Sequence, residues 1–217
     1  MSTVLFVDLG NTNVCWRAWC DGAWDGEMER HAVSGAPTIL RVVARRLKAV
    51  QIVAVVTSPA NGDRVEQAIQ AAELAFIRVG RDLPVPVETA YTDPLQIGAD
   101  RLCNALAARE RYGAPVVSAS AGTCLTVEAM NEAGVVLGGA IAAGVPAAVA
   151  GIAYTVPHLA QAAREAAQAA WTSDAPGRST EENLVIGLGV GAAGALEALI
   201  ALARRAVGSD APVVVTG

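Results

Sequence analysis

The chain has 217 residues, of which 53% are hydrophobic and 17% are charged. This composition excludes a disordered protein and suffices for one large domain or two small ones. A net charge of -5 gives no basic surface, so we expect no nucleic-acid partner. We find no unbroken apolar run near the roughly 18–20 residues that span a bilayer, and no signal-peptide pattern. We therefore expect a cytoplasmic protein without membrane contact.

Two predicted strands near the beginning of the chain are joined by a polar turn. Residues 4–7 and 14–19 are apolar runs, and the turn between them reads Asp8-Leu9-Gly10-Asn11-Thr12-Asn13. Asn, Gly and Asp dominate turns for conformational reasons, so the segment can be a plain hairpin turn.

The same turn has the side chains of a phosphate-binding loop. Gly10 leaves the backbone open to a ligand, Asn11 and Thr12 can donate hydrogen bonds, and Asp8 can hold a hydrated Mg²⁺ on phosphate oxygens. The pattern GxxxxGKS/T does not occur, nor does GxGxxG directly after a strand. Any nucleotide site here is therefore neither a P-loop nor a dinucleotide-binding fold.

Five further elements predict a mixed sheet with helical cover in the first half of the chain. They are a strand within 23–33, a helix over 37–49, a strand over 52–56, a helix to about residue 74 and a strand over 76–79. The expected N-cap of the second helix is Asn61 or Asp63.

Residues 91–104 combine a turn with the start of a helix that reaches about residue 112. Asp100 opens this helix, where an acidic side chain usually satisfies free amides and stabilises by roughly 0.5–2 kcal/mol. Its neighbours favour a second interpretation, because Gly98 permits a close approach, Arg101 suits a carboxylate and Tyr91 lies one short loop away. Both interpretations of Asp100 remain open, as a helix-start residue and as part of a site for a small anion.

The second half of the chain repeats the plan of the first. Strands are predicted over 115–118, 124–130 and 135–141, and the turn between the first two contains Ser120, Gly122 and Thr123. A strand, a Gly-Thr turn and a returning strand thus occur twice, which predicts an internal duplication. Two such turns across a cleft would hold both ends of a triphosphate.

Helices and one strand complete the chain. They are helices over 144–152 and 160–171, a linker over 172–177, a long helix that opens within 178–183 and runs to about 207, and a strand over 213–215. Ser179 or Thr180 is the expected N-cap of the long helix, and Thr180 can also contact a ligand. Glycines inside this helix lower its intrinsic stability, so we expect them to contact another backbone, from the sheet, a ligand or a second subunit.

Several spaced motifs resemble those of type III pantothenate kinases, a family that includes proteins once called Bvg accessory factors. The similar segments are Asp8-Leu9-Gly10-Asn11-Thr12 (family DxGNT), residues 91–101 (YxxPxxxGADR), Gly122-Thr123 (GTA), residues 138–144 (GGAIxPG) and Arg178-Ser179-Thr180 (RNT). The resemblance implies an α/β fold of two duplicated ribonuclease H-like (actin-like ATPase) domains with mixed sheets and an ATP cleft between them. We expect domains over 1–112 and 113–217, and a homodimer.

The resemblance also implies a reaction, the ATP-dependent phosphorylation of pantothenate in coenzyme A biosynthesis. Asp100 would be the catalytic base. The implied ATP-binding residues are Asp8, Leu9, Gly10, Asn11, Thr12, Asn13, Val14, Cys15, Gly122 and Thr123. The implied pantothenate-binding residues are Tyr91, Gly98, Ala99, Asp100, Arg101 and Thr180. The implied cofactors are Mg²⁺, which Asp8 would hold through water, and K⁺ or NH₄⁺.

Three departures from the family pattern leave alternatives open. Ser120 stands where the family has an Asp that helps to bind the monovalent cation, so the need for that cation is undecided. Ala143 replaces a proline of the family, and the sequence stops at Thr216-Gly217 within a TGG motif, so we expect a truncated second domain. The alternatives are a catalytically impaired paralogue that acts as a nucleotide-binding regulatory or interaction module, and another small-molecule kinase of the same superfamily.

Overall fold

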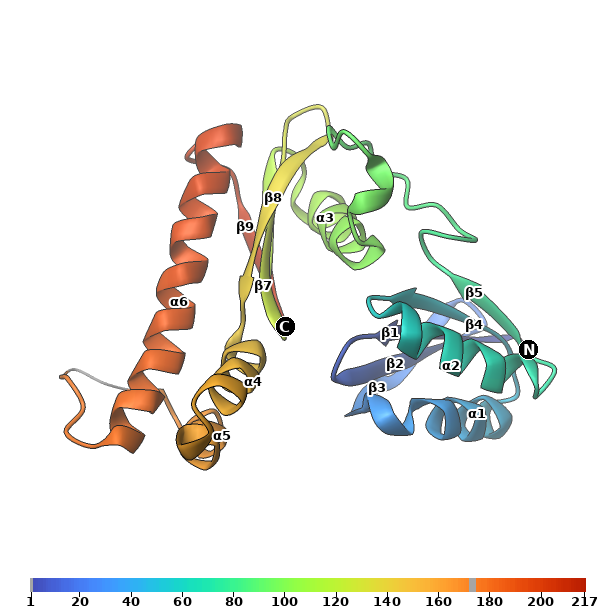
Figure 1. The fold of residues 1–217 in the computed structure, drawn as a ribbon. Helices are drawn as coiled ribbons and strands as arrows, with labels where there is room; N and C mark the ends of the chain where they lie inside the picture. The colour runs from blue at the N-terminus through green and yellow to red at the C-terminus, as the bar shows by residue number, and fades with distance from the viewer. Residues whose placement is uncertain (1, 172–174) are drawn as a thin grey trace. The chain divides into compact units, whose positions relative to one another are not determined.

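The computed structural model describes residues 2–171 and 175–217 (Figure 1). These residues form two compact units. Unit 1 comprises Met1–Pro86 and Leu95–Cys103, and unit 2 comprises Val87–Pro94 and Asn104–Gly217. Helix α3 (Ala99–Tyr112) contributes its first residues to unit 1 and the rest to unit 2. The domain boundary after residue 112 stays a prediction.

Unit 1 contains a five-stranded mixed sheet in the order β3-β2-β1-β4-β5. The strands are β1 (Thr3–Leu9), β2 (Asn13–Cys20), β3 (Ala23–Ala32), β4 (Ala49–Val56) and β5 (Ala75–Arg78). The first three pair antiparallel, and β4 and β5 continue the sheet parallel to β1. The helices are α1 (Ala36–Leu47) and α2 (Pro59–Gln70), with a short 3-10 turn at Val33–Gly35. A second 3-10 turn, Pro94–Gln96, begins with the last residue of the Val87–Pro94 segment of unit 2.

The core of unit 1 lies between one face of this sheet and its two long helices. Alternate residues of β1 are buried, and Leu5 packs in one cluster with Ile52 of β4, Leu40 of α1 and Ile69 of α2. The alternation follows from strand geometry, which turns successive side chains to opposite faces. Asp8 therefore belongs to the face opposite Leu9.

The expected N-cap of α2 is wrong. The helix begins at Pro59, and Ser58 is its N-cap. Proline suits the first position because the N–H that it lacks would have no helical partner there. Asn61 and Asp63 lie inside the helix, so their side chains are free to contact other elements.

Unit 2 contains a four-stranded sheet in the order β8-β7-β6-β9. The strands are β6 (Val116–Ala121), β7 (Cys124–Met130), β8 (Val136–Ala143) and β9 (Val213–Thr216), and the helices are α4 (Val145–Thr155), a 3-10 turn (Pro157–Leu159), α5 (Ala160–Ala166) and α6 (Thr180–Val207). The helix predicted over 160–171 ends earlier, at Ala166. Part of the predicted linker, residues 172–174, lies outside the described residues.

The two sheets confirm the predicted duplication. In each, the first strand pairs antiparallel with the second and parallel with a later strand, as β1 does with β2 and β4 and β6 does with β7 and β9. Asp8 and Ser120 are the penultimate residues of β1 and β6, so they occupy equivalent places beside the two turns.

Helix α6 lies along the sheet of unit 2 (Figure 1). Its Ala203 packs in one cluster with Val117, Ala119 and Val127. With an 18-residue window of mean hydropathy 2.0, α6 is long and apolar enough to cross a membrane by length and composition, although Glu197 interrupts its apolar run. One such helix is weak support for a membrane protein, because core helices of soluble proteins also meet the criterion.

Candidate functional site

The turn between β1 and β2 is closed by backbone hydrogen bonds. The amide of Gly10 donates to the carbonyl of Asn13 at 2.9 Å, and the carbonyl of Thr12 accepts from Val33 at 2.9 Å. From α2, the Asn61 side-chain amide donates to the carbonyl of Gly10 at 3.3 Å. Asn11 and Thr12 are exposed. The turn is thus held from behind while its polar side chains face solvent.

Asp100 lies in unit 1 beside the ends of two parallel strands. Thr57, the first residue after β4, donates its amide to Leu9 at 3.1 Å and its hydroxyl to Asp100 Oδ2 at 3.4 Å. A side chain at Gly98 would collide with Asp100 Oδ1, so the carboxylate folds back over that glycine. Asp100 lies in the first turn of α3.

The carboxylates of Asp8 and Asp100 are close enough for their charges to interact. Although Asp8 is exposed to solvent, partial loss of hydration raises its pKa, the charge of Asp100 raises it further and Arg30 opposes the shift. Burial, with the same two carboxylates, raises the pKa of the Cys103 thiol to about 11. These groups therefore share one electronegative region, and Cys103 stays protonated.

A hard cation fits the donor chemistry of this region. Mg²⁺ prefers one or two carboxylates and keeps several waters, and Asp8 and Asp100 supply carboxylate oxygens. Among the described residues, no group of three or more His, Cys, Asp or Glu side chains gathers to form a complete metal cage. A bound Mg²⁺ would therefore need phosphate oxygens or water as its other ligands.

The equivalent turn of unit 2 carries hydroxyl groups. Ser120 pairs across the sheet with Thr126 of β7 and Thr216 of β9, so the three side chains share one face. Gly122 donates its amide to the carbonyl of Cys124 at 3.1 Å. None of these three cross-strand neighbours, which we call the hydroxyl row, carries a carboxylate. The equivalent position of Ser120 in unit 1 is occupied by Asp8.

Helix α4 begins directly against this second turn. Gly144, its N-cap, donates its amide to the carbonyl of Thr123 at 3.1 Å. A side chain on Gly144 would overlap the carbonyl of Gly122, and Gly217 packs just as closely against Ala121. The free amides at the start of α4 are therefore held beside the turn, an arrangement that favours anions.

The other predicted site residues are placed as follows. Leu9, Val14 and Cys15 are buried, and Val14 belongs to the core, so they can offer only main-chain atoms to a nucleotide. Within unit 1, the structure brings Asp100 to Thr57 and within charge range of Asp8. Gly98 contacts Asp100, Ala99 lies beside Gly80, and Arg101 is buried. Tyr91 and Thr180 belong to unit 2. Thr180 is exposed at the first position of α6, whose N-cap is Ser179.

Sequence reasoning missed two residues that border this region. Thr57 directly follows the strand predicted over 52–56 and is not among the predicted site residues, although the carboxyl ends of neighbouring parallel strands meet at one edge of a sheet and commonly bind ligands. Asn61 was expected to cap a helix, and the structure shows it bound to the Gly10 carbonyl instead.

The sequence profile of the family described as type III pantothenate kinase matches residues 4–202. The chain belongs to this family. It is 29% identical over 231 residues to the type III pantothenate kinase of Thermomicrobium roseum, a match covering 99% of this chain and 85% of that one. It is 30% identical over 213 residues to that of Rubrobacter xylanophilus, covering 91% and 77%. The protein is therefore a kinase, and pantothenate kinase function is what its relatives support.

Solved structures with similar folds support the actin-like ATPase architecture. The activator of the 2-hydroxyisocaproyl-CoA dehydratase from Clostridium difficile with bound ADPNP matches with a TM-score of 0.55 and 10% identity, over 98% of this chain and 80% of that chain. The ethanolamine utilization protein EutJ from Carboxydothermus hydrogenoformans matches with a TM-score of 0.54 and 14% identity, over 99% and 76%. At these identities the likeness shows the fold alone.

Proposed function

We propose that this kinase transfers the γ-phosphate of ATP to the primary hydroxyl of pantothenate, giving 4'-phosphopantothenate in coenzyme A biosynthesis. The observation that carries the proposal is the pair of carboxylates in unit 1. Asp8 stands beside a turn suited to phosphate, and Asp100 lies within range of its charge while bound by Thr57. Phosphoryl transfer needs this combination of a phosphate site and a neighbouring base.

Asp100 would take the proton of the pantothenate hydroxyl as its oxygen attacks the γ-phosphorus. An ordinary Asp is a weak base, but phosphoryl transfer depends mainly on position and on charge neutralisation. The hydroxyl of Thr57 occupies one oxygen of Asp100, at 3.4 Å from Oδ2. The second oxygen would accept the proton.

The two turns would hold the phosphates of ATP. In the first turn, Gly10 leaves the backbone accessible, and Asn11 and Thr12 carry exposed donors. In the second, Gly122 and Thr123 lie beside the first amides of α4. Mg²⁺ would supply charge neutralisation on the phosphate oxygens, with Asp8 holding it through water.

Pantothenate would be recognised by charge and by close backbone approach. Arg101 offers the guanidinium suited to a carboxylate, and Gly98 and Ala99 present backbone at the start of α3. Tyr91 and Thr180 complete the set that the family resemblance implies. A monovalent cation, if bound beside Ser120, would meet hydroxyl oxygens and no negative side chain in that row.

We also propose a cytoplasmic homodimer. Its support is the outer side of α6, where Val190 and Leu202 are 54% and 50% exposed and no atom of the described residues stands within 4 Å of a methyl group placed at Gly191 or Gly194. A second α6 could approach this side closely, because residues without side chains bring helix backbones together.

A second candidate is a pantothenate kinase paralogue of impaired activity that acts as a nucleotide-binding regulatory module. The hydroxyl row at Ser120 favours it, because that row offers no carboxylate to a cation. Such a protein would bind ATP or pantothenate without turnover.

One experiment separates the candidates. ADP release from Mg-ATP is followed with and without pantothenate, in K⁺ and in Na⁺ buffers, and binding of both substrates is measured by calorimetry. Pantothenate-dependent ADP release supports the kinase, and equal rates in both buffers would assign cation independence to Ser120. Binding without release would support the regulatory module, and release with another acceptor only would overturn the proposed substrate.

A further inference from the structure

The turn after β5 is tightly closed. Gly80, at its apex, donates its amide to the carbonyl of Leu83 at 2.7 Å, and Asp82 donates its amide to the carbonyl of Arg78 at 2.8 Å. The Asp82 side chain returns a bond, accepting from the amide of Arg78 at 2.8 Å. Gly80 has a φ of +88°, a conformation that glycine adopts readily and other residues rarely. The backbone of the turn therefore has little room to move.

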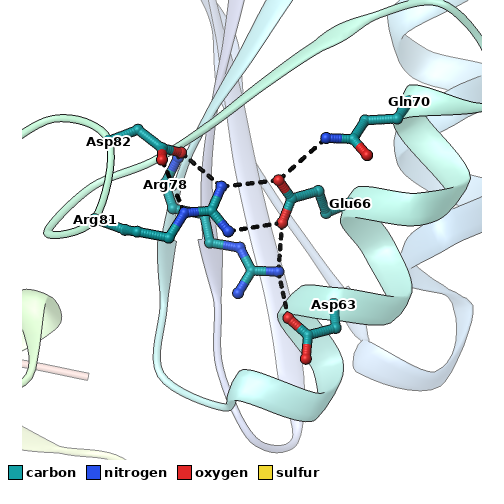
Figure 2. A network of polar contacts seen from close by, with 6 residues as sticks. All are labelled: Asp63, Glu66, Gln70, Arg78, Arg81 and Asp82. Atoms are coloured by element: carbon teal, nitrogen blue, oxygen red, sulfur yellow. Dashed lines mark hydrogen bonds and ion pairs between the residues drawn. The ribbon is translucent and has the colours of Figure 1, made fainter.

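Ion pairs fasten this turn to helix α2 (Figure 2). Arg78 lies 2.6 Å from Glu66 and 2.7 Å from Asp63. Arg81 binds both oxygens of Glu66, at 2.8 and 3.0 Å, and also bonds to Asp82 at 2.7 Å. Only 11% of the Arg78 side chain and 13% of the Glu66 side chain are exposed. Bidentate, charge-assisted bonds with little solvent access fix geometry well.

The turn meets the start of α3 at its apex. A methyl group on Gly80 would stand 2.8 Å from the Cβ of Ala99, closer than packed carbon atoms allow. Ala99 immediately precedes Asp100. Helix α2 also contacts the predicted phosphate turn, because the Asn61 side chain donates a hydrogen bond to the carbonyl of Gly10. One helix thus contacts both the phosphate turn and the turn that abuts the residue before the proposed base.

We propose that the turn after β5 sets the position of Asp100, because its contact with Ala99 limits how closely the start of α3 can approach. Gly80 is the positioning residue, and we call this turn a stop. The inference rests on the proposed function, because it assumes that Asp100 receives the proton. Since the ion pairs hold the turn, added bulk at residue 80 displaces Ala99 and with it Asp100. A misplacement of about 1 Å at a reacting group costs roughly 10²-fold in rate.

The test uses Gly80→Ala with a matched control, Gly22→Ala. Gly22 also lies in unit 1 and has a φ of +92°, but a methyl group there has no neighbour within 4 Å in the described part of the chain. Both variants place alanine in the left-handed region, so their melting temperatures should fall by similar amounts. Only Gly80→Ala should lower kcat, by about tenfold or more, with the KM for ATP nearly unchanged. A kcat for Gly80→Ala equal to that of Gly22→Ala would overturn the inference.

A double-mutant cycle with Ala99→Gly isolates the contact. Removing the Ala99 methyl group restores the space, so Gly80→Ala should cost much less kcat in the Ala99→Gly background than alone. An equal loss in both backgrounds would assign the effect to backbone strain and refute the role of a stop.

Crystal structures of the two glycine variants test the inference without activity. In Gly80→Ala the hydrogen bond between Thr57 and Asp100 should be broken or lengthened, and in Gly22→Ala it should remain. A Gly80→Ala structure in which the turn has moved and Asp100 has not would refute the stop even in an active kinase. Absence of pantothenate turnover by the wild-type protein would instead refute the proposed function, and the structures would still decide the positioning role.

Discussion

Gly144→Ala tests the contact between helix α4 and the second predicted phosphate turn. The backbone of Gly144, with φ -82° and ψ 176°, suits alanine as well as glycine, so the substitution adds volume without backbone strain. The new methyl group would overlap the carbonyl oxygen of Gly122 and stand 2.8 Å from that of Thr123. Because these neighbours are backbone atoms, the turn and the helix must separate by roughly half an ångström or more.

We expect this separation to cost about 1–3 kcal/mol of stability and to raise the KM for ATP by about tenfold or more. Gly151→Ala is the matched control, because Gly151 lies in the same helix and the added methyl group would have no neighbour within 4 Å among residues 2–171 and 175–217. That control should gain up to about 1 kcal/mol and keep the wild-type KM. Thermal unfolding and ADP release measure the two effects. A wild-type KM for ATP in Gly144→Ala would refute the assignment of this turn to phosphate.

Three further predictions concern single interactions. Ser179→Ala removes the acceptor of the Glu182 amide at 3.1 Å and should cost about 1 kcal/mol in denaturant unfolding; an unchanged midpoint would contradict the cap. The hydrogen bond from Arg81 lowers the pKa of Asp82 from 3.8 to about 2. The stabilisation that the ionised Asp82 gives the folded state is therefore complete above pH 3.8 and is lost as the pH falls toward 2. Thermal melts at graded pH should show less acid destabilisation in that window for Asp82→Asn than for the wild type. Thr57→Val removes the hydroxyl bound to Asp100 and should lower kcat several-fold without changing ATP affinity; an unchanged kcat would show that Asp100 needs no such partner.

Local sequence patterns were sufficient to predict most of the fold. Apolar runs located most strands of both sheets, because buried strands leave a short, nearly continuous apolar signal; the exposed β3 has no such run. The repeated Gly-Thr turn predicted the duplication, since it marks the same hairpin in each unit. The predicted opening of the long helix within residues 178–183 is confirmed, because Ser179 and the acidic residues of its first turn form a recognisable start.

The errors arose where distant contacts decide the outcome. Pro59 moves the beginning of α2 ahead of Asn61, which then binds the Gly10 carbonyl. Residues 167–169 form turns after α5, although their alanines and glutamine favour a helix, because intrinsic propensity is only a weak prior.

The site was only partly predictable for the same reason. Motif spacing identified Asp8 and Asp100, but their electrostatic proximity depends on the fold of unit 1. The contact between Gly80 and Ala99 has no sequence signal, because it joins a turn and a helix start through the shape of the backbone. Thr57 gave only the signal of a strand end.

The central claim is that Asp100 accepts the proton of pantothenate during phosphoryl transfer. The most direct measurement is the transfer of labelled γ-phosphate from ATP to pantothenate, with product identified by mass, for wild type, Asp100→Asn and the exposed control Asp25→Asn. We predict labelled phosphopantothenate from wild type and Asp25→Asn, and at least about 10²-fold less from Asp100→Asn with ATP binding retained. Undiminished transfer by Asp100→Asn would contradict the account and leave Asp100 a helix-start residue.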